Sequence, residues 1–220
     1  MSPFLCATDA MSETPPPPAG RPSLEPREIT DPRELRALTH PVRLSLIEVL
    51  ASHGSLTATE AGELIGESPT TCSFHFRQLA RYGFVEEAGG GAGRNRPWRL
   101  VNLGMRFDEA GQDAEMAIAA ESLEGLIYGR MFDRFEQWRR VKHADADEWQ
   151  SASGVNETIM YVTPAELREL VEELQRLLSR YHERLVDPGL RPPGARLVEV
   201  LAAAYPVRFG RVRDEPPEGV

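Results

Sequence analysis

The 220-residue sequence predicts a mainly α fold of the α+β class, in which a compact helical unit with one β-hairpin precedes a longer helical extension. Three observations predict it. Apolar residues recur at spacings of three and four along most of the chain after residue 31. Helix-start signals, a capping residue followed by proline or by glutamate three positions on, precede several of these stretches. One glycine-rich segment, 89–93, lies between two short strand-like runs.

Composition limits the class of protein. Residues 1–28 are expected to be a disordered, proline-rich arm, because a polyproline run covers 15–18 and few apolar side chains are available to bury. Cys6 and Cys72 are the two cysteines, which excludes a disulfide scaffold and fits a reducing cytoplasm. No stretch approaches the ~20 apolar residues that a membrane span needs, so no membrane partner is expected.

The charge is unevenly distributed. The formal net charge of −9 argues against a nucleic-acid partner, because phosphate binding needs a basic surface. Residues 104–220, however, carry 15 basic and 22 acidic side chains, whereas residues 68–103 carry five arginines against two glutamates. The basic region is therefore compact and lies in the first half of the chain.

Two helices are expected between residues 31 and 54. Asp31 caps the first, with proline at its first helical position. His40 precedes Pro41, and a residue before proline disfavours the α-helical conformation. The first helix should therefore end before His40, and a second helix should begin at Pro41. It should end near Gly54, where glycine can adopt a left-handed conformation.

Two shorter helices and a hairpin should follow. Thr57 caps the third helix, which Gly66 ends, and Ser68 caps the fourth, over 69–82. Strands over 84–87 and 97–101 then flank the glycine-rich segment. The expected core positions are Ala61, Leu64 and Ile65 in the third helix and Cys72, Phe76 and Leu79 in the fourth.

This order of elements is the physical description of a winged helix-turn-helix, in which the second helix of the motif enters the DNA major groove. Since the core side of helix 69–82 is fixed, its other side should contact double-stranded DNA, and the wing 88–97 should reach phosphates or the minor groove. His75 could instead pack beside Phe76, and Arg43 could either contact a phosphate or pair with a carboxylate. The candidate DNA-binding residues are Thr70, Thr71, Ser73, Phe74, His75, Arg77, Arg94, Arg96 and Arg99.

Two runs carry a family resemblance. LRALTHPVRL, over 35–44, resembles the opening helix pair of the arsenical-resistance-repressor (ArsR)-like winged-helix family. SPTTCSFHFRQL, over 68–79, with YGFVE at 82–86, resembles the recognition helix of that family and the strand after it. The resemblance covers about residues 31–103, and it implies a homodimeric transcriptional regulator, usually a repressor.

The sequence departs from the metal-sensing members of that family. These members carry a cysteine pair or cluster in the helix before the recognition helix, or His and acidic ligands on the last helix. Here helix 58–65 has no cysteine, and Cys72 is expected to face the core. His182 and His143 lack partners at ligand spacing on one helix face. We therefore expect no metal site and no cofactor.

The chain is expected to divide into the arm, a DNA-binding domain at 29–103, a helical region at 104–212 and a frayed tail at 213–220. Within the helical region, helices are expected at 107–141 and 164–186, with short strands at 158–162 and 197–204. The region could form the dimer interface. Alternatively, it could hold a small apolar effector in a pocket lined by Tyr128, Phe132, Phe135, Trp138 and Trp149.

An enzymatic function is not expected. The sequence has no nucleophile elbow and no paired metal motif, and its glycine-rich segment does not open a helix as a phosphate-binding loop would. A winged helix that binds a protein instead of DNA remains as the alternative, because the acidic chain lowers nonspecific DNA affinity.

Overall fold

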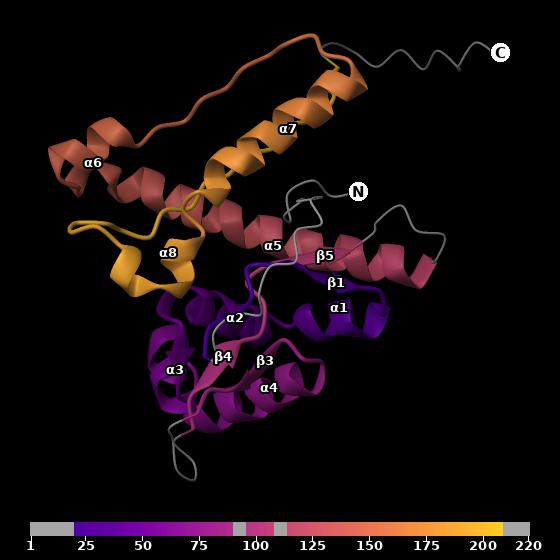
Figure 1. The fold of residues 1–220 in the computed structure, drawn as a ribbon, viewed down its shortest axis with the longest axis vertical. Coiled ribbons are helices and arrows are strands. Elements are labelled where there is room, and N and C mark those ends of the chain that lie inside the picture. The colour runs from indigo at the N-terminus through magenta and orange to yellow at the C-terminus, as the bar shows by residue number, and fades with distance from the viewer. Residues whose placement is uncertain (1–19, 90–95, 108–113, 209–220) are drawn as a thin grey trace.

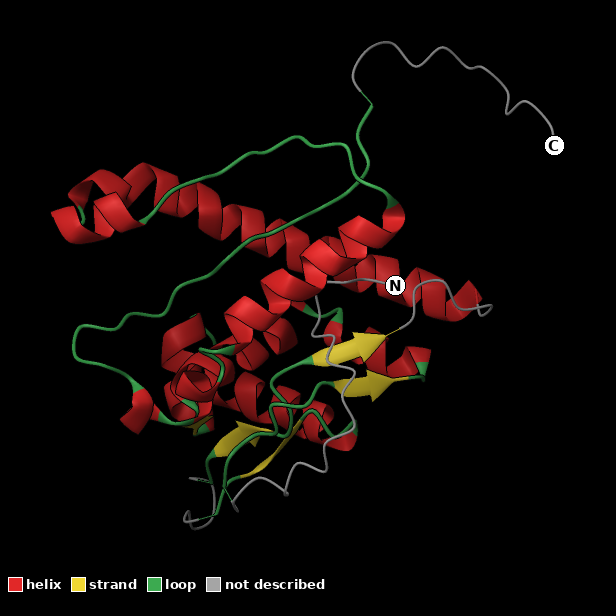
Figure 2. Cartoon of the chain, turned by 45° about the horizontal axis from the view of Figure 1, so that its top comes forward, coloured by secondary structure: helices red, strands yellow, loops and turns green. Residues whose placement is uncertain are grey.

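The computed structural model describes residues 20–89, 96–107 and 114–208 (Figure 1). Helices dominate, and the strands lie in the first half of the chain (Figure 2). The helices of the N-terminal unit are α1 (Pro32–Leu38), α2 (Pro41–His53), α3 (Ala58–Ile65) and α4 (Pro69–Arg81).

The predicted hairpin is present within a three-stranded sheet. β3 (Val85–Glu87) pairs antiparallel with β4 (Trp98–Leu100), as the strand-like runs indicated. A further strand that the sequence did not predict, β2 (Ser55–Leu56), pairs with the other edge of β4. β2 directly follows α2, and β3 follows α4. The chain therefore enters the sheet both before and after the helix pair α3–α4.

The helix boundaries confirm the local start and stop signals. Asp31, His40, Thr57 and Ser68 cap α1 to α4, and each side chain accepts a hydrogen bond from a backbone N–H of the first turn. Gly66 ends α3 at φ +74°, a left-handed conformation that glycine adopts without strain. The turn between α3 and α4 is therefore tight.

One core position was predicted wrongly. Leu64 is 48% exposed, although Ala61 on the same helix is fully buried. In α4, Cys72, Phe76 and Leu79 are fully buried, as their spacing predicted. The short α3 thus contributes mainly small residues to the core.

Residues 20–28 are ordered, which corrects the expected limit of the disordered arm. β1 (Arg27–Ile29) pairs in parallel with β5 (Met105–Phe107). Ile29 is buried, and Arg27 donates hydrogen bonds to the Glu34 carboxylate at 2.7 Å and to the Tyr82 carbonyl at 2.6 Å. The local composition could not reveal this strand, since its partner lies far along the chain. Residues 1–19 lie outside the described residues.

The core continues past residue 103, where a domain boundary was expected. Phe107 of β5 and the first turns of α5 (Ala114–Val141) belong to the same buried cluster as α1, α2 and α4. Phe107 was expected at the start of the long helix, but it lies in a strand. The buried residues of α5 are Met116, Ala119, Ala120 and Leu123.

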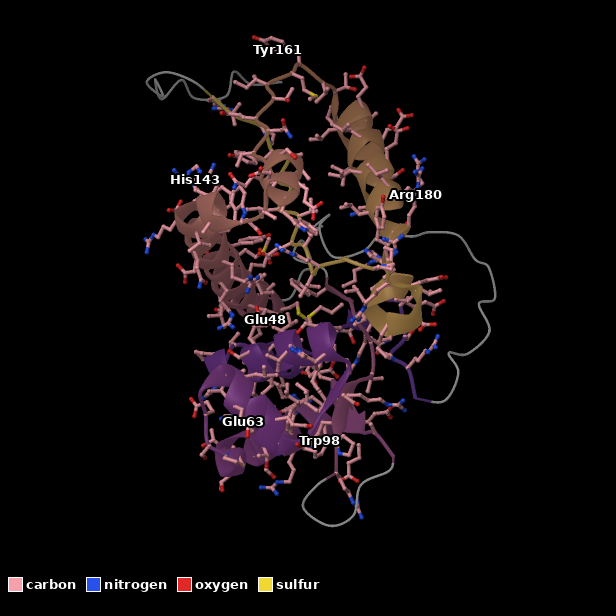
Figure 3. The ribbon with its side chains drawn as sticks, turned by 90° about the vertical axis from the view of Figure 1, so that its left-hand side faces the viewer. Glu48, Glu63, Trp98, His143, Tyr161 and Arg180 are labelled. Carbon is pink, nitrogen blue, oxygen red and sulfur yellow. The ribbon has the colours of Figure 1, made fainter. Side chains whose placement is uncertain are left out.

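Beyond Leu123, charged side chains connect α5 to α2. Glu48 of α2 forms ion pairs with Arg130 and with Arg134, whose Nη1 lies 2.8 Å from the carboxylate. Arg134 also pairs with Glu199, which lies in the extended C-terminal segment. Figure 3 shows Glu48 at the junction between the N-terminal unit and the helical region.

The described part of the chain after α5 consists of helices and irregular segments. The helices are α6 (Asp147–Ala152), α7 (Pro164–Ser179) and α8 (Glu183–Val186), so the helix expected at 164–186 is interrupted after Ser179. The strands expected at 158–162 and 197–204 are wrong: neither segment forms a strand. Strand propensity describes residues that suit a pleated, half-buried surface, and neither segment packs on such a surface. Within the described residues, no helix is long and apolar enough to cross a lipid bilayer.

Candidate nucleic-acid interface

The outward side of α4 is a continuous strip of exposed side chains. Thr70, Phe74 and Arg77 are exposed at helical spacing, and Phe74 is 51% exposed despite its apolar ring. Arg81 continues the strip one turn further. Because the opposite side of α4 is fixed in the core, the strip has a defined orientation.

Arg81 belongs to the strip although it was not among the expected DNA-binding residues. It follows Arg77 at a spacing of four, so the same periodicity that placed Arg77 outward could have identified it. Among the described residues, neither arginine forms an ion pair with a carboxylate. Both guanidinium groups are therefore available to an anionic partner.

Thr71 and Ser73 are only half-exposed, so they are less accessible than the spacing indicated. The Thr71 hydroxyl lies 2.8 Å from the hydroxyl of Ser68, which also accepts a hydrogen bond from the Thr71 N–H at 3.0 Å. Thr71 thus takes part in capping α4. Its hydroxyl would have to exchange this partner for a base edge or a phosphate.

The base of the wing is less basic than its sequence indicated. Arg96 pairs with Glu87 at 2.6 Å, and Arg99 pairs with Glu86 at 2.7 Å across the β3–β4 register. Arg99 is only 17% exposed at its side chain, so the structure does not present it to DNA as expected. The tip residue Arg94 lies outside the described residues.

His75 packs inside the domain, which supports the second of its two interpretations. The residue is 8% exposed, and its ring centroid lies 4.4 Å from that of His40 and 5.2 Å from that of Phe74. In this arrangement the buried His75 is not accessible for a direct contact with DNA. Its neighbour Phe74 takes the exposed position.

Arg43 has no carboxylate partner within the described residues, so the ion pair, one of its two interpretations, is not formed there. Its Nε is buried without a hydrogen-bond partner, and burial lowers the pKa of its guanidinium from the ordinary value. Arg43 and His40 both act electrostatically on His75, as does the carboxylate of Glu67. His40 and Arg43 are thus gathered around His75 of α4.

This cluster makes the stability of the domain depend on pH. Burial, and then repulsion from His40 and Arg43, lowers the pKa of His75, while Glu67 opposes the shift. The unfolded chain therefore binds more protons than the folded chain near the ordinary histidine pKa of about 6.5. We expect the free energy of unfolding to fall as the pH decreases through and below that value.

Urea unfolding at a series of pH values between about 5 and 8 measures this dependence. The dependence should become smaller in His75→Gln, whereas His53→Gln, at an exposed histidine, should keep it. A wild-type stability that is flat or rises on acidification across this range would contradict the assignment.

The five aromatic residues expected around an effector do not line one pocket. Tyr128 and Phe132 are exposed, whereas Phe135 and Trp138 stack at 5.8 Å. Trp138 and Trp149 border a small cavity whose other walls are largely polar. The apolar effector pocket is therefore not formed by these residues in this structure.

The described residues do not gather metal ligands. No group of three or more His, Cys, Asp or Glu side chains within them is placed to hold an ion. Cys72 is a buried free thiol, and burial raises its pKa above the ordinary value. A buried, protonated thiol is a poor metal ligand.

Comparison with known protein families matches this geometry. Residues 38–88 match a family model described as a helix-turn-helix domain, and the matched segment runs from the end of α1 through β3. The chain contains a helix-turn-helix domain. No curated protein matches the sequence.

Proposed function

We propose that this protein is a sequence-specific, DNA-binding transcriptional regulator that acts as a homodimer. The observation that carries the proposal is the exposed strip of α4, formed by Thr70, Phe74, Arg77 and Arg81, on the second helix of a helix-turn-helix domain. In this motif the second helix reads base edges in the major groove. The resemblance to the ArsR-like family favours repression.

The side chains of the strip suit DNA. A guanidinium group can donate two hydrogen bonds to one guanine, and an exposed phenyl ring can contact a thymine methyl group. Arg77 and Arg81 are not neutralised by carboxylates within the described residues, in contrast to Arg96 and Arg99 at the wing. We therefore assign readout mainly to α4 and expect a smaller contribution from the base of the wing.

A homodimer would place two α4 helices about one DNA turn apart, ~34 Å. Apolar side chains on the outer part of the molecule support self-association: Phe132 of α5, Leu170 and Leu177 of α7, and Tyr181 after α7 are all exposed. Contiguous exposed apolar surface is typical of interaction sites. We expect light scattering at micromolar concentration to give twice the chain mass, and a monomer mass would contradict the dimer.

The contribution of the wing can be measured through salt. Each phosphate contact releases counterions, so the logarithm of DNA affinity should fall linearly with the logarithm of salt concentration, with a slope of ~0.9 per contact. Replacing Arg94 and Arg96 by Ala should weaken binding to all duplexes about equally and flatten this slope. Arg139→Ala, at an exposed arginine of α5 paired with Glu136, is the matched control.

Fluorescence anisotropy with duplexes of different sequence, at several salt concentrations, provides the measurement. Because Arg96 must leave Glu87 to reach a phosphate, Arg94→Ala alone should account for most of the change. A double variant that binds as tightly as the wild type would show that the wing does not lie along the DNA.

The alternative function, binding of a protein by the winged helix, has one specific observation in its favour. Glu63 of α3 is exposed (Figure 3), as is Glu67, which directly precedes the α4 cap Ser68. The base of the wing is neutralised by Glu86 and Glu87. These carboxylates reduce the electrostatic attraction of α4 and the wing for DNA phosphates. If duplex DNA does not bind saturably even at low salt, the protein-binding alternative is favoured.

A further inference from the structure

A cavity of about 220 Å³ lies where the C-terminal region meets the helix-turn-helix domain. Its walls come from the end of α2, from β4 and the segment after it, and from α8, which lies beside α2 in Figure 1. Gly20 and Pro22 form a further side. The cavity therefore joins segments far apart in the sequence.

Arg99, which lines this cavity, is paired with Glu86 but keeps one N–H donor without a partner. Its Nε and Nη2 donate to the Glu86 carboxylate at 2.9 and 2.7 Å. Its Nη1 is buried and has no hydrogen-bond partner. That nitrogen points toward the Gly20 side, where an added Cβ on Gly20 would lie 3.3 Å from it. A buried donor without an acceptor is costly, so the position of Nη1 indicates a missing acceptor.

The cavity is cationic, although the chain as a whole is acidic. Two arginines, Arg99 and Arg191, line it, and no carboxylate is among the described residues that do so. Arg191 is held in place by donating to the carbonyls of Arg184 and Leu185 at 2.7 and 3.2 Å. The nearby carboxylate of Asp187 pairs with Arg21. The polar component of a ligand for this cavity should therefore be an anion.

The remaining walls are apolar. Ala51 of α2, Leu103, and Leu185 and Val186 of α8 are half-buried around the cationic groups. Such a combination of charged groups with apolar walls orients a ligand that is charged at one end. The small volume excludes a large ligand.

We propose that this cavity binds a small monocarboxylate with a short apolar chain. The carboxylate accepts a hydrogen bond from Nη1 of Arg99, and the apolar chain lies against Leu103, Leu185 and Val186. The bound ligand connects α8 to β4 and so stabilises the packing of the C-terminal region on the helix-turn-helix domain. The proposal is independent of the DNA-binding function, because binding is measured without DNA.

Isothermal titration calorimetry on the full chain tests the proposal with three probes. Hexanoate carries both the charge and the chain, 1-hexanol carries the chain alone, and inorganic phosphate carries charge alone. We expect hexanoate to bind at one site per chain and at least ~10-fold more tightly than either of the others, since a charge-assisted hydrogen bond and apolar burial act together only in hexanoate.

Variants locate the site. Arg99→Gln removes the cation and should weaken hexanoate binding ~10-fold or more. Arg96→Gln changes a neighbouring arginine that is exposed and outside the cavity, and it should leave hexanoate affinity unchanged. Leu185→Glu, in the peripheral α8, should abolish binding by placing a carboxylate in the cavity.

Three outcomes would overturn the proposal. Equal affinity for hexanoate and 1-hexanol would show that the cation is not used. Phosphate binding as tight as hexanoate would indicate a simple anion site. Wild-type hexanoate affinity in Arg99→Gln, with circular dichroism showing a folded variant, would place the ligand elsewhere.

Discussion

Gly62→Ala is expected to destabilise the domain by about 1–3 kcal/mol, although alanine is the better helix former. Gly62 lies in α3 at its closest approach to the start of α4. A Cβ there would lie 2.6 Å from the Glu67 carbonyl oxygen, 3.5 Å from the Pro69 nitrogen and 3.6 Å from the Cys72 Sγ. Since the closest atom belongs to the backbone of the turn between the two helices, this turn would have to shift relative to α3.

Denaturant unfolding of the variant measures this cost. The matched control is Gly125→Ala in the helix α5, where an added Cβ meets nothing within 4 Å. That substitution should raise the free energy of unfolding by about 0.5–1 kcal/mol, through helix propensity alone. If Gly62→Ala were as stable as the wild type, the close approach of the α3–α4 turn to Gly62 would be contradicted.

Arg77→Ala is expected to weaken binding to the preferred DNA sequence by ~1–3 kcal/mol per half-site and to relax specificity at one base position. Arg77 is exposed in the middle of the α4 strip and has no ion-pair partner among the described residues, so its loss should not affect folding. Binding to nonspecific duplexes should change much less, because the phosphate contacts of the wing remain.

Competition binding with the preferred duplex and with single-base variants of it distinguishes base recognition by Arg77 from sequence-independent attraction to the DNA backbone. Arg180→Ala, at an exposed arginine after α7, is the control and should leave both affinities unchanged (Figure 3). An equal loss on all sequences would assign Arg77 to the DNA backbone, and no loss would remove α4 from the interface.

The features that the sequence predicted well are local ones. Capping residues such as Thr57 and Ser68 act within one helical turn, and the burial of Phe76 and Leu79 follows from their spacing on a single helix. The resulting order of helices, turn and hairpin determines the outward face of α4. These signals do not depend on distant parts of the chain.

The features that the sequence did not predict depend on contacts between distant segments. β1 forms because β5 passes beside it, and His75 is buried because His40, from the start of α2, packs against it. A count of arginines indicated a basic wing, but the strand register places Glu86 opposite Arg99, and Glu87 forms an ion pair with Arg96. Conversely, residues 158–162 have strand composition but no strand partner.

Selection of bound duplexes from a random DNA library, with the full chain, tests the central claim most directly. The proposed homodimer predicts enrichment of an inverted repeat whose half-site centres lie about one helical turn, ~34 Å, apart. The same selection with Arg77→Ala should lose preference at one position of each half-site. Recovery of no enriched sequence at low salt would contradict sequence-specific DNA binding by α4.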